Sequence, residues 1–393
     1  MSHLSRRPLS LLVVICLVAL AACGSDPEES AEAEPDPPAA PATTDDAEPG
    51  ATEPTSSEPA QLPEDPAALA EIDSPQRNEL LAELAAEAGA PVNLYTTLSL
   101  EDVEPVVDAF IERYGVQVET YRALAPDVTA RAVNELTAGR PGFDIIWANG
   151  QAATNLAQEG AFTAFTTPYS EGIPEDLISS ELWIPTDVNY WSWAYNPDLL
   201  TDDQLPRSYT DLTAPEWMGE ISLARYIDWF ATVWTEMGDT EAEAFFSGLA
   251  ANDPFITRPS FTLAQQFVST GELPLTISTT SSLAHRENVA GAPIEGYFPD
   301  APTVARPNAA GWNAEGPSPA AGLLFADFLI DPSGAQQVLS DIGRIPVHDD
   351  VEVDPPTLRA EEFVTVDFES FAAEQEMWDQ RWEEYFGAEM FEG

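Results

Sequence analysis

Apolar and polar positions follow two different spacings along most of this chain. Val92 to Thr96 and Phe143 to Trp147 are short apolar runs, typical of strands that are buried on both faces of a parallel sheet. Val116 to Tyr121 alternates apolar and polar residues with a period of two, which also predicts a strand. These three segments therefore predict the strands of one sheet.

Between the predicted strands, apolar residues recur every three or four positions, as in amphipathic helices. This spacing predicts helices from Ser99 to Gly115, from Pro126 to Thr137 and from Gln151 to Gln158. An earlier helix is expected between Ser74, as N-cap, and Gly89. Strands that alternate with helices predict an α/β fold, a doubly wound and mainly parallel sheet flanked by helices.

Polar residues stand where two predicted strands end and the following helices begin. In doubly wound folds, ligands bind at such carboxyl ends of strands. Here these ends carry Thr96 and Thr97, and then Asn149 and Gln151. Hydroxyl and amide groups suit a small polar ligand or an anion, although helix capping explains Ser99 equally well.

The N-terminal segment has the pattern of an exported lipoprotein. Arg6 and Arg7 precede an apolar run from Leu9 to Leu20, and Ala21 to Cys23 follow it. The run is shorter than the ~20 residues of a membrane-spanning helix, so residues 1–22 are predicted to be a signal peptide. Cys23 would then be lipidated, for example with palmitate, and would anchor the exported protein to the outer face of the cell membrane. The arginine pair leaves both the general and the twin-arginine export routes open.

Composition separates a linker from a folded domain. Residues 23–75 are rich in Pro and Ala, with 15 acidic and no basic residues, and are predicted to be a disordered linker. Residues 76–393 are long enough for a large core. The chain has a net charge of −53 and no lysine, so nucleic acid is excluded as a partner. Cys16 leaves with the signal peptide and Cys23 carries lipid, so no disulfide is expected.

Several segments in the second half resemble a known family. They are Asn189 to Leu200 (NYWSWAYNPDLL), Asp211 to Ser222 (DLTAPEWMGEIS), Leu263 to Ser278, Phe325 to Val347 and Val366 to Phe386. These segments resemble the extracellular solute-binding proteins of ABC importers, and most of all the branch that contains ferric-iron binders. The resemblance implies a two-lobe, type II periplasmic-binding-protein-like fold, in which crossover hinge strands join two α/β lobes.

The resemblance also implies approximate lobe boundaries. Lobe 1 would span about residues 92–190 and 303–350, lobe 2 about residues 195–299, and a C-terminal helical segment about residues 358–393. The implied function is capture of a small solute and its delivery to ABC permease subunits. A monomer is expected.

The family's iron ligands are missing from the matching positions. The tyrosine pair of iron binders falls on Ser281 and Ser282, their histidine on Thr96 or Thr97, and their acid on Asn149 or Gly150. The expected ligand is therefore a small organic solute or an oxyanion-bearing compound, with no metal and no other cofactor. An Fe(III) site of other composition is the alternative, with Tyr195, Tyr226 and Tyr297 as candidate ligands.

Arginines and aromatic residues are further candidates for ligand contacts. Arg225 and Arg286 would hold a carboxylate or phosphate, although pairing with a surface acid explains Arg286 equally well. Trp191, Tyr226 and Trp312, if they converge beside Asp228, would favour a cationic amine. A sugar would suit the same rings by stacking.

An exported hydrolase is the competing functional class. The chain has neither a Gly-x-Ser-x-Gly nor a His-Glu-x-x-His motif. Carboxylate pairs carry little information in a chain with 68 acids. The protein is therefore expected not to be an enzyme.

Overall fold

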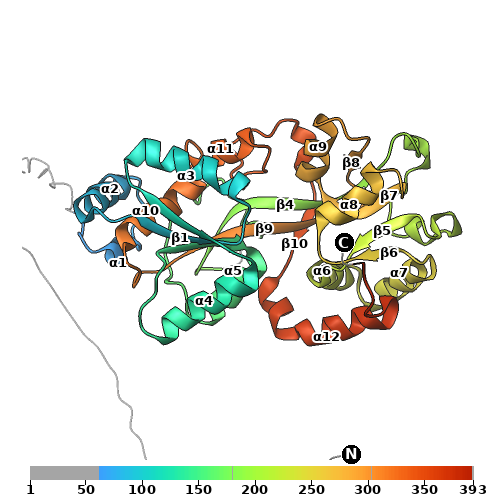
Figure 1. Cartoon of the computed structure of the whole chain (residues 1–393), viewed down its shortest axis with the longest axis horizontal. Helices are drawn as coiled ribbons and strands as arrows, with labels where there is room; N and C mark the ends of the chain where they lie inside the picture. Colours follow the sequence, from blue (N-terminus) through green and yellow to red (C-terminus); the bar gives the residue numbers. More distant parts are fainter. Residues whose placement is uncertain (1–61, 179, 302, 392–393) are drawn as a thin grey trace, which may run out of the picture. The chain divides into compact units, whose positions relative to one another are not determined.

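Two long antiparallel strands, β4 (Ile184–Tyr195) and β9 (Thr303–Trp312), connect two α/β lobes in the computed structural model of the chain (Figure 1). The structure describes residues 62–391, apart from residues 179 and 302. The predicted signal peptide, Cys23 and most of the predicted linker lie outside these residues. Within them the strand order is β2-β1-β3-β9-β4-β7-β5-β6, with β10 beside β9 and β8 beside β4.

The first lobe contains the parallel strands β2, β1 and β3, and β3 pairs with β9 in antiparallel register. Its strands are β1 (Val92–Thr96), β2 (Val118–Arg122) and β3 (Ile145–Asn149). One face packs on α2 (Gln76–Ala88), α3 (Leu100–Tyr114), α10 (Pro319–Ile330) and α11 (Ala335–Asp341). The other face packs on α4 (Ala125–Thr137) and α5 (Gly150–Gln158).

The second lobe contains the parallel strands β7, β5 and β6, and β7 pairs with β4 in antiparallel register. Its strands are β5 (Ile221–Ala224), β6 (Phe255–Thr257), β7 (Leu275–Thr280) and β8 (Glu295–Tyr297). One face packs on α8 (Phe261–Ser269) and α9 (Ser281–Val289), and the other on α6 (Ile227–Met237) and α7 (Asp239–Ala251). The short 3-10 helices are η1 (Glu175–Leu177), η2 (Asp202–Gln204), η3 (Asp211–Thr213), η4 (Pro215–Trp217) and η5 (Pro356–Leu358).

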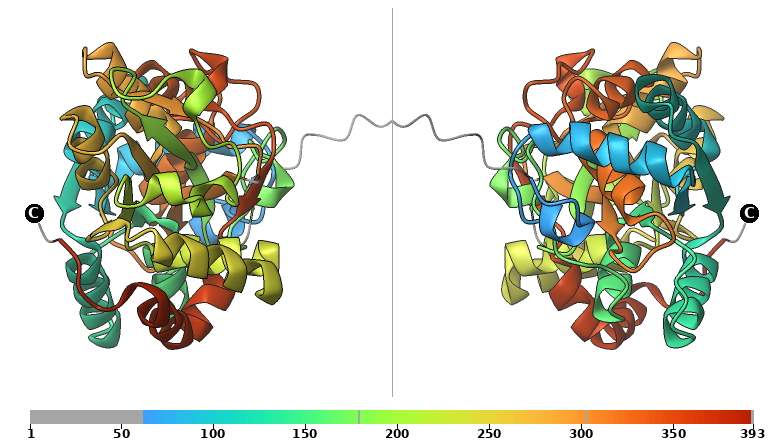
Figure 2. Two further views of the ribbon diagram at one scale, coloured as in Figure 1. Left: turned by 90° about the vertical axis from the view of Figure 1, so that its right-hand side faces the viewer. Right: turned by 90° about the vertical axis from the view of Figure 1, so that its left-hand side faces the viewer.

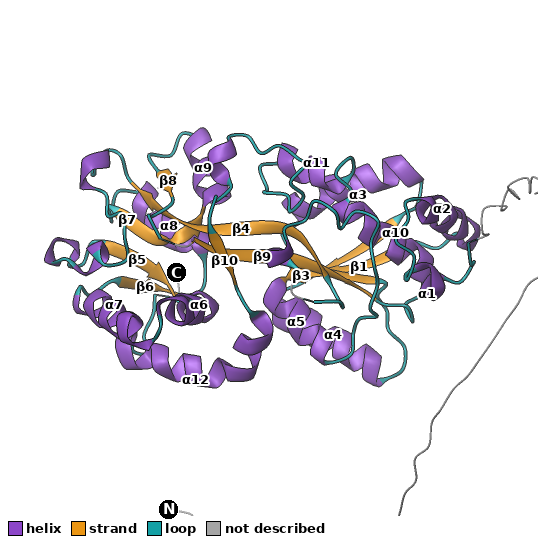
Figure 3. Cartoon of the chain, turned by 180° about the vertical axis from the view of Figure 1, so that it is seen from behind, coloured by secondary structure: helices purple, strands orange, loops and turns teal. Residues whose placement is uncertain are grey.

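The C-terminal segment crosses from one lobe to the other. After η5, β10 (Phe363–Thr365) pairs with β9, and α12 (Phe368–Phe386) then packs against α6 and α7 of the second lobe. The beginning of α12 also contacts α5 of the first lobe, as seen from behind (Figure 3). Views along the long axis show the helices on both sides of each sheet (Figure 2). The predicted fold class is therefore confirmed: each lobe is a mainly parallel sheet flanked by helices, and crossover strands join the lobes.

Two local expectations are wrong. The linker does not extend to residue 75, because α1 (Pro66–Leu69) forms there and Leu69 and Ala70 are buried in the core of the first lobe. Asp65 caps α1 with its side chain. The next helix begins at Gln76 with no side-chain cap, so Ser74 is not its N-cap. None of the helices among residues 62–391 is both long and apolar enough to cross a membrane.

Candidate ligand-binding site

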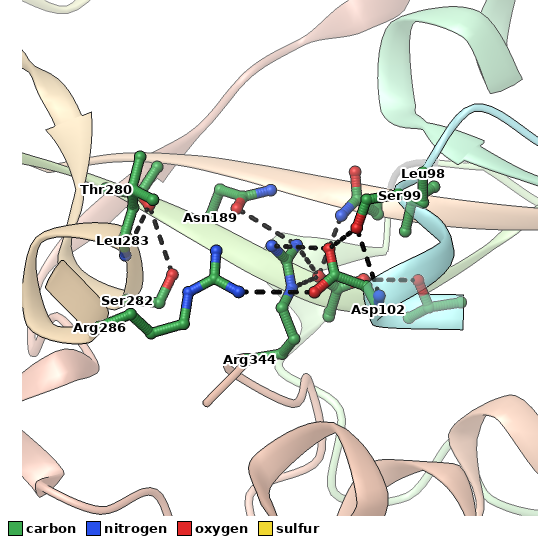
Figure 4. Close-up of polar contacts among 12 residues, drawn as sticks. Leu98, Ser99, Asp102, Asn189, Thr280, Ser282, Leu283, Arg286 and Arg344 are labelled. Carbon is green, nitrogen blue, oxygen red and sulfur yellow. Dashed lines mark hydrogen bonds and ion pairs between the residues drawn. The ribbon is translucent and has the colours of Figure 1, made fainter. Parts of the chain in front are cut away.

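A cluster of arginines and carboxylates lies where the two lobes meet the hinge strands (Figure 4). Arg344, which follows α11, donates from Nε to Asp187 Oδ2 of β4 at 3.0 Å and from Nη2 to Asn189 Oδ1 at 3.3 Å. The Asp187 carboxylate also accepts a bond from Asn308 Nδ2 of β9 at 2.9 Å. Burial alone would lower the pKa of Arg344, but Asp187 and Asp102 outweigh it and raise this pKa.

Asp102 lies between two arginines that come from different parts of the fold. Its carboxylate is 3.8 Å from Nη1 of Arg344 and 3.6 Å from Nη1 of Arg286. Asp102 belongs to α3 of the first lobe, whereas Arg286 belongs to α9 of the second lobe. The Arg286–Asp102 pair therefore spans the two lobes. Both distances exceed the ~2.7–3.2 Å of a hydrogen bond, so these guanidinium N–H groups remain available to a shorter-range acceptor.

The first turn of α3 holds Asp102 in place. Ser99 caps the helix, because its Oγ accepts a bond from the Asp102 backbone N–H at 3.3 Å. The same hydroxyl donates to Asp102 Oδ2 at 3.0 Å. A serine followed by an acid three residues later is a common helix start, and here the acid also faces the second lobe.

A second ion pair joins β9 to the start of α6. Arg306 Nε lies 2.5 Å from Asp228 Oδ2, and its guanidinium is 5.5 Å from the ring centroid of Tyr226 and 6.0 Å from that of Phe368. Burial alone would lower the pKa of Arg306, but Asp228 and then Tyr226 counteract it, and the net shift is upward. Asp228 is thus already paired within the protein.

The predicted residues at the ends of β1 and β3 do lie together. The Asn149 backbone N–H donates to Thr97 Oγ1 at 3.2 Å, and the Asn149 side chain caps α5 through Ala152. Thr96 is fully buried and its Oγ1 accepts a bond from the Leu98 N–H, so it does not face a ligand. Gln151 donates to Asn155, while its buried Oε1 has no hydrogen-bond partner among the described residues.

At the end of β7 the two predicted serines point in different directions. Ser281 Oγ donates to the carbonyl oxygen of Leu358 at 2.6 Å, whereas Ser282 Oγ lies 3.3 Å from Thr280 Oγ1. Ser282 lies near Arg286 in the cluster of Figure 4. Arg225 pairs with Asp379 of α12 at 2.9 Å and therefore holds the C-terminal helix.

Trp191, Tyr226 and Trp312 do not all converge, so the condition for a cationic amine site is not met. Trp312 is fully buried in the core of the first lobe, where its Nε1 donates to the carbonyl oxygen of Pro319. Trp191 is buried in the second lobe, donates to Ile277 and contacts the edge of Tyr226. Strand residues alternate between faces, and sequence alone did not show which face each tryptophan occupies.

The three tyrosines of the alternative iron site do not form one. Tyr195 donates to Asp202 and Glu295, and Tyr297 donates to the carbonyl oxygen of Pro206. Burial is the main cause that raises the pKa of Tyr195, Tyr297 and Tyr226, which disfavours the tyrosinate that iron requires. No group of three or more His, Cys, Asp or Glu side chains in the described part of the chain is placed to hold a metal.

Sequence reasoning missed Asp102, Arg344 and Arg306. Asp102 looks like an ordinary acid in the first turn of a helix. Arg344 lies inside the family-like segment Phe325 to Val347, but that resemblance assigns it no role. Asp102 and Arg344 lie close together in the fold although 242 residues separate them in the sequence. Arg306 lies in a strand segment, Arg306-Pro307-Asn308, whose unusual polarity was the one available signal.

A family model described as bacterial extracellular solute-binding protein matches residues 140–374, more than half of the chain. The chain belongs to this family. Membership makes it an exported binding protein that takes up a small-molecule solute for an ABC transporter permease. Among curated proteins, none matches the sequence.

Solved structures share the fold of this solute-binding protein. The apo ferric ion-binding protein A of Pasteurella haemolytica has a TM-score of 0.65 at 17% identity and covers 76% of this chain and 98% of its own. The Trichodesmium protein IdiA (FutA), in complex with iron and citrate, has a TM-score of 0.64 at 18% identity, covering 74% and 99%.

AfuA, a periplasmic binding protein of Actinobacillus pleuropneumoniae with fructose-6-phosphate bound, has a TM-score of 0.63 at 18% identity, covering 76% and 99%. The likeness to the iron-binding branch is thereby confirmed for the fold. Because these matches are all below 25% identity, the structures leave the solute of this chain open.

Proposed function

We propose that this protein is a lipid-anchored receptor that captures a small organic or oxyanion-bearing solute between its lobes and delivers it to an ABC permease. It performs no covalent chemistry of its own. The observation that carries the proposal is the position of Arg286 and Arg344 on either side of Asp102, at the junction of the lobes. A ligand carboxylate or phosphate between the two guanidiniums would gain shorter, charge-assisted bonds than Asp102 makes.

The chemistry of the neighbouring groups supports an organic solute over Fe(III). Iron requires several anionic oxygen donors, whereas the end of β7 presents the hydroxyls of Thr280 and Ser282. The one acid between the two arginines, Asp102, is paired with them. Among fold relatives both kinds of ligand occur: AfuA holds fructose-6-phosphate and the Trichodesmium protein holds iron and citrate.

Membrane attachment through Cys23 completes the proposal. The described domain begins at residue 62, so about 38 residues separate it from Cys23. A coil of that length reaches roughly 35 Å root mean square, and further when acidic and rich in proline. Such a tether would keep the receptor near its permease while both lobes remain free to move.

A thermal-shift screen of the chain from residue 24 onward tests the ligand class. Fructose 6-phosphate, other organic phosphates, small carboxylates, amines, sugars and ferric citrate would be compared. We expect an organic anion to raise the unfolding midpoint of the wild type. Arg286→Gln should weaken its binding roughly 10- to 100-fold, through loss of a charge-assisted contact.

Arg140→Gln is the matched control, because Arg140 is an exposed arginine of the first lobe outside this cluster. It should bind like the wild type. A midpoint that rises with ferric citrate alone would contradict the proposal, and turnover of any compound would favour an exported hydrolase instead.

A further inference from the structure

Helix α9 presents two polar faces to two different places. Ser282 and Arg286, one turn apart, face Asp102 at the lobe junction (Figure 4). A separate cavity is lined by Ser281, His285 and Asn288, which are spaced by four and three residues along the helix. The hydroxyl of Ser281 already points to this second side, since it donates to Leu358.

The cavity lies between α9, strands β4 and β8, and the segment 355–358 that contains η5. Its volume is about 420 Å³, within the ~300–1,000 Å³ of small-molecule sites. Leu358 belongs to the hydrophobic core of the first lobe, whereas α9 and β8 belong to the second lobe. Both lobes therefore contribute to the cavity wall.

Ser192 of β4 supplies an observation that points to a ligand. Its side chain is fully buried, it lines the cavity, and its Oγ has no hydrogen-bond partner among the described residues. The register of β4 against β7 shifts between Ser192 and Ala194, and such bulges re-aim side chains. Buried hydroxyls are normally hydrogen-bonded, so a group entering the cavity would satisfy this one.

The residues that line the cavity determine which kind of ligand fits it. The lining offers hydroxyl, imidazole and amide groups, which come from Ser192, Ser281, His285 and Asn288. It also offers the aromatic ring of Tyr297. The one carboxylate in the lining is Glu295, and none of its described lining residues is an arginine or lysine. Hydroxyl-bearing compounds match these donors and acceptors, whereas an anion would meet a negative charge without compensation.

We propose that this cavity is a second ligand site, separate from the lobe junction, for a hydroxylated compound of monosaccharide size that is uncharged or carries one ammonium group. Ser192 hydrogen-bonds the occupant, Glu295 accepts from its hydroxyl or ammonium group, and Tyr297 packs against its ring. Because both lobes form the wall, occupancy is coupled to the relative position of the lobes.

Calorimetric titration of the chain from residue 24 onward with D-glucosamine and D-glucose tests the site, with glucose 6-phosphate as the anionic comparison. Ser192→Ala removes a hydroxyl that has no partner within the described part of the chain, so the thermal midpoint should stay the same or rise. The affinity should nevertheless fall about 3- to 10-fold, because the ligand loses one hydrogen bond. If Ser192 had only a structural role, its replacement would not lower the affinity while leaving the thermal midpoint unchanged or higher.

Thr357→Trp is the blocking variant, because Thr357 is exposed at the rim of the cavity and its replacement leaves the core intact. It should abolish binding of both sugars, whereas Arg286→Gln, at the lobe junction, should retain that binding, changed at most by the coupling between the lobes. If the proposed function is wrong, no organic anion will bind in a way that depends on Arg286. That result does not affect sugar binding in the cavity, so the two proposals are tested separately.

Three results would overturn the second site. One is the absence of saturable binding of both sugars up to about 10 mM, ten times the dissociation constant of a weak 1 mM complex. Another is binding that Thr357→Trp leaves intact or Arg286→Gln removes, which would place the sugars in the lobe junction. The last is tighter binding of glucose 6-phosphate than of glucose through the same Ser192-dependent contact.

Discussion

Arg77 shows how one side chain fixes the beginning of the folded domain. Its guanidinium makes a bidentate pair with Asp327 of α10, at 2.9 and 2.6 Å, and both residues are fully buried. It also donates to the carbonyl oxygens of Leu69, Ile72 and Thr166. The beginning of the described domain, around α1, is thereby attached to the core of the first lobe.

Arg77→Met should therefore destabilise the protein by about 3–5 kcal/mol at pH 7.5, because it leaves the Asp327 carboxylate buried and unpaired. Burial already raises the pKa of Asp327 from 3.8 to about 6, against the opposing effect of Arg77. A carboxyl whose pKa is raised by folding binds more protons in the native state, so its contribution to stability falls as the pH rises between these values.

Without Arg77 this pKa rises further, so the penalty of Arg77→Met should be smaller at pH 5 than at pH 7.5. Urea unfolding at the two pH values measures it. The double variant Arg77→Met/Asp327→Leu should recover much of the loss, since it removes both charges. An equal penalty at both pH values would contradict this interpretation.

At the scale of elements, the contact between α5 and α12 ties the C-terminal helix of the second lobe to the first lobe. Gly150 begins α5 and Phe368 begins α12, where it is buried. A Cβ atom on Gly150 would lie 2.2 Å from Cε2 of Phe368. The absence of a side chain at residue 150 is therefore what allows the two helices to approach.

Gly150→Ala should cost about 1–3 kcal/mol through overpacking, despite the better helix propensity of alanine. Urea unfolding of the single variant, of Phe368→Leu and of the double variant forms a double-mutant cycle. The double variant should be more stable than the sum of the single losses predicts. Strict additivity would show that the two helices do not press on each other at this point.

The elements themselves were largely predictable from sequence, because periodicity reports burial directly. The run Val92–Thr96 is β1 without change, and the predicted third strand is β3 shifted by two residues. Helix α1 was missed, because four residues in a segment rich in Pro and acids give no periodic signal. Arg77, which lies outside any motif, holds this segment because it donates hydrogen bonds to the carbonyl oxygens of Leu69 and Ile72.

The site was predictable only where it depends on strand ends. Thr97 and Asn149 lie at such ends, as the doubly wound pattern requires, and the family resemblance places Ser282 just after β7. The pairing of Asp102 with Arg344 depends on tertiary contact between distant segments, which one sequence does not reveal. Trp312 failed as a candidate for another reason: aromatic residues on a strand fit a core as well as a ligand.

At the scale of the molecule, two lobes on a pair of hinge strands meet at a few charged contacts in an otherwise strongly acidic protein. With a net charge of −53, arginines are scarce, yet Arg286, Arg306 and Arg344 gather around β4 and β9. Each of them faces a carboxylate, of Asp102, Asp187 or Asp228, so the charge at the junction is balanced. An anionic group that replaces Asp102 beside Arg286 and Arg344 would therefore stabilise the closed arrangement of the lobes.

Small-angle X-ray scattering of the chain from residue 24 onward tests this account most directly. The radius of gyration would be measured with and without the solute that raises the unfolding midpoint most, and with ferric citrate. We predict that an organic solute with an anionic group reduces the radius of gyration of the wild type, and that Arg286→Gln abolishes the reduction. A reduction with ferric citrate alone, or one that Arg286→Gln leaves unchanged, would contradict the account.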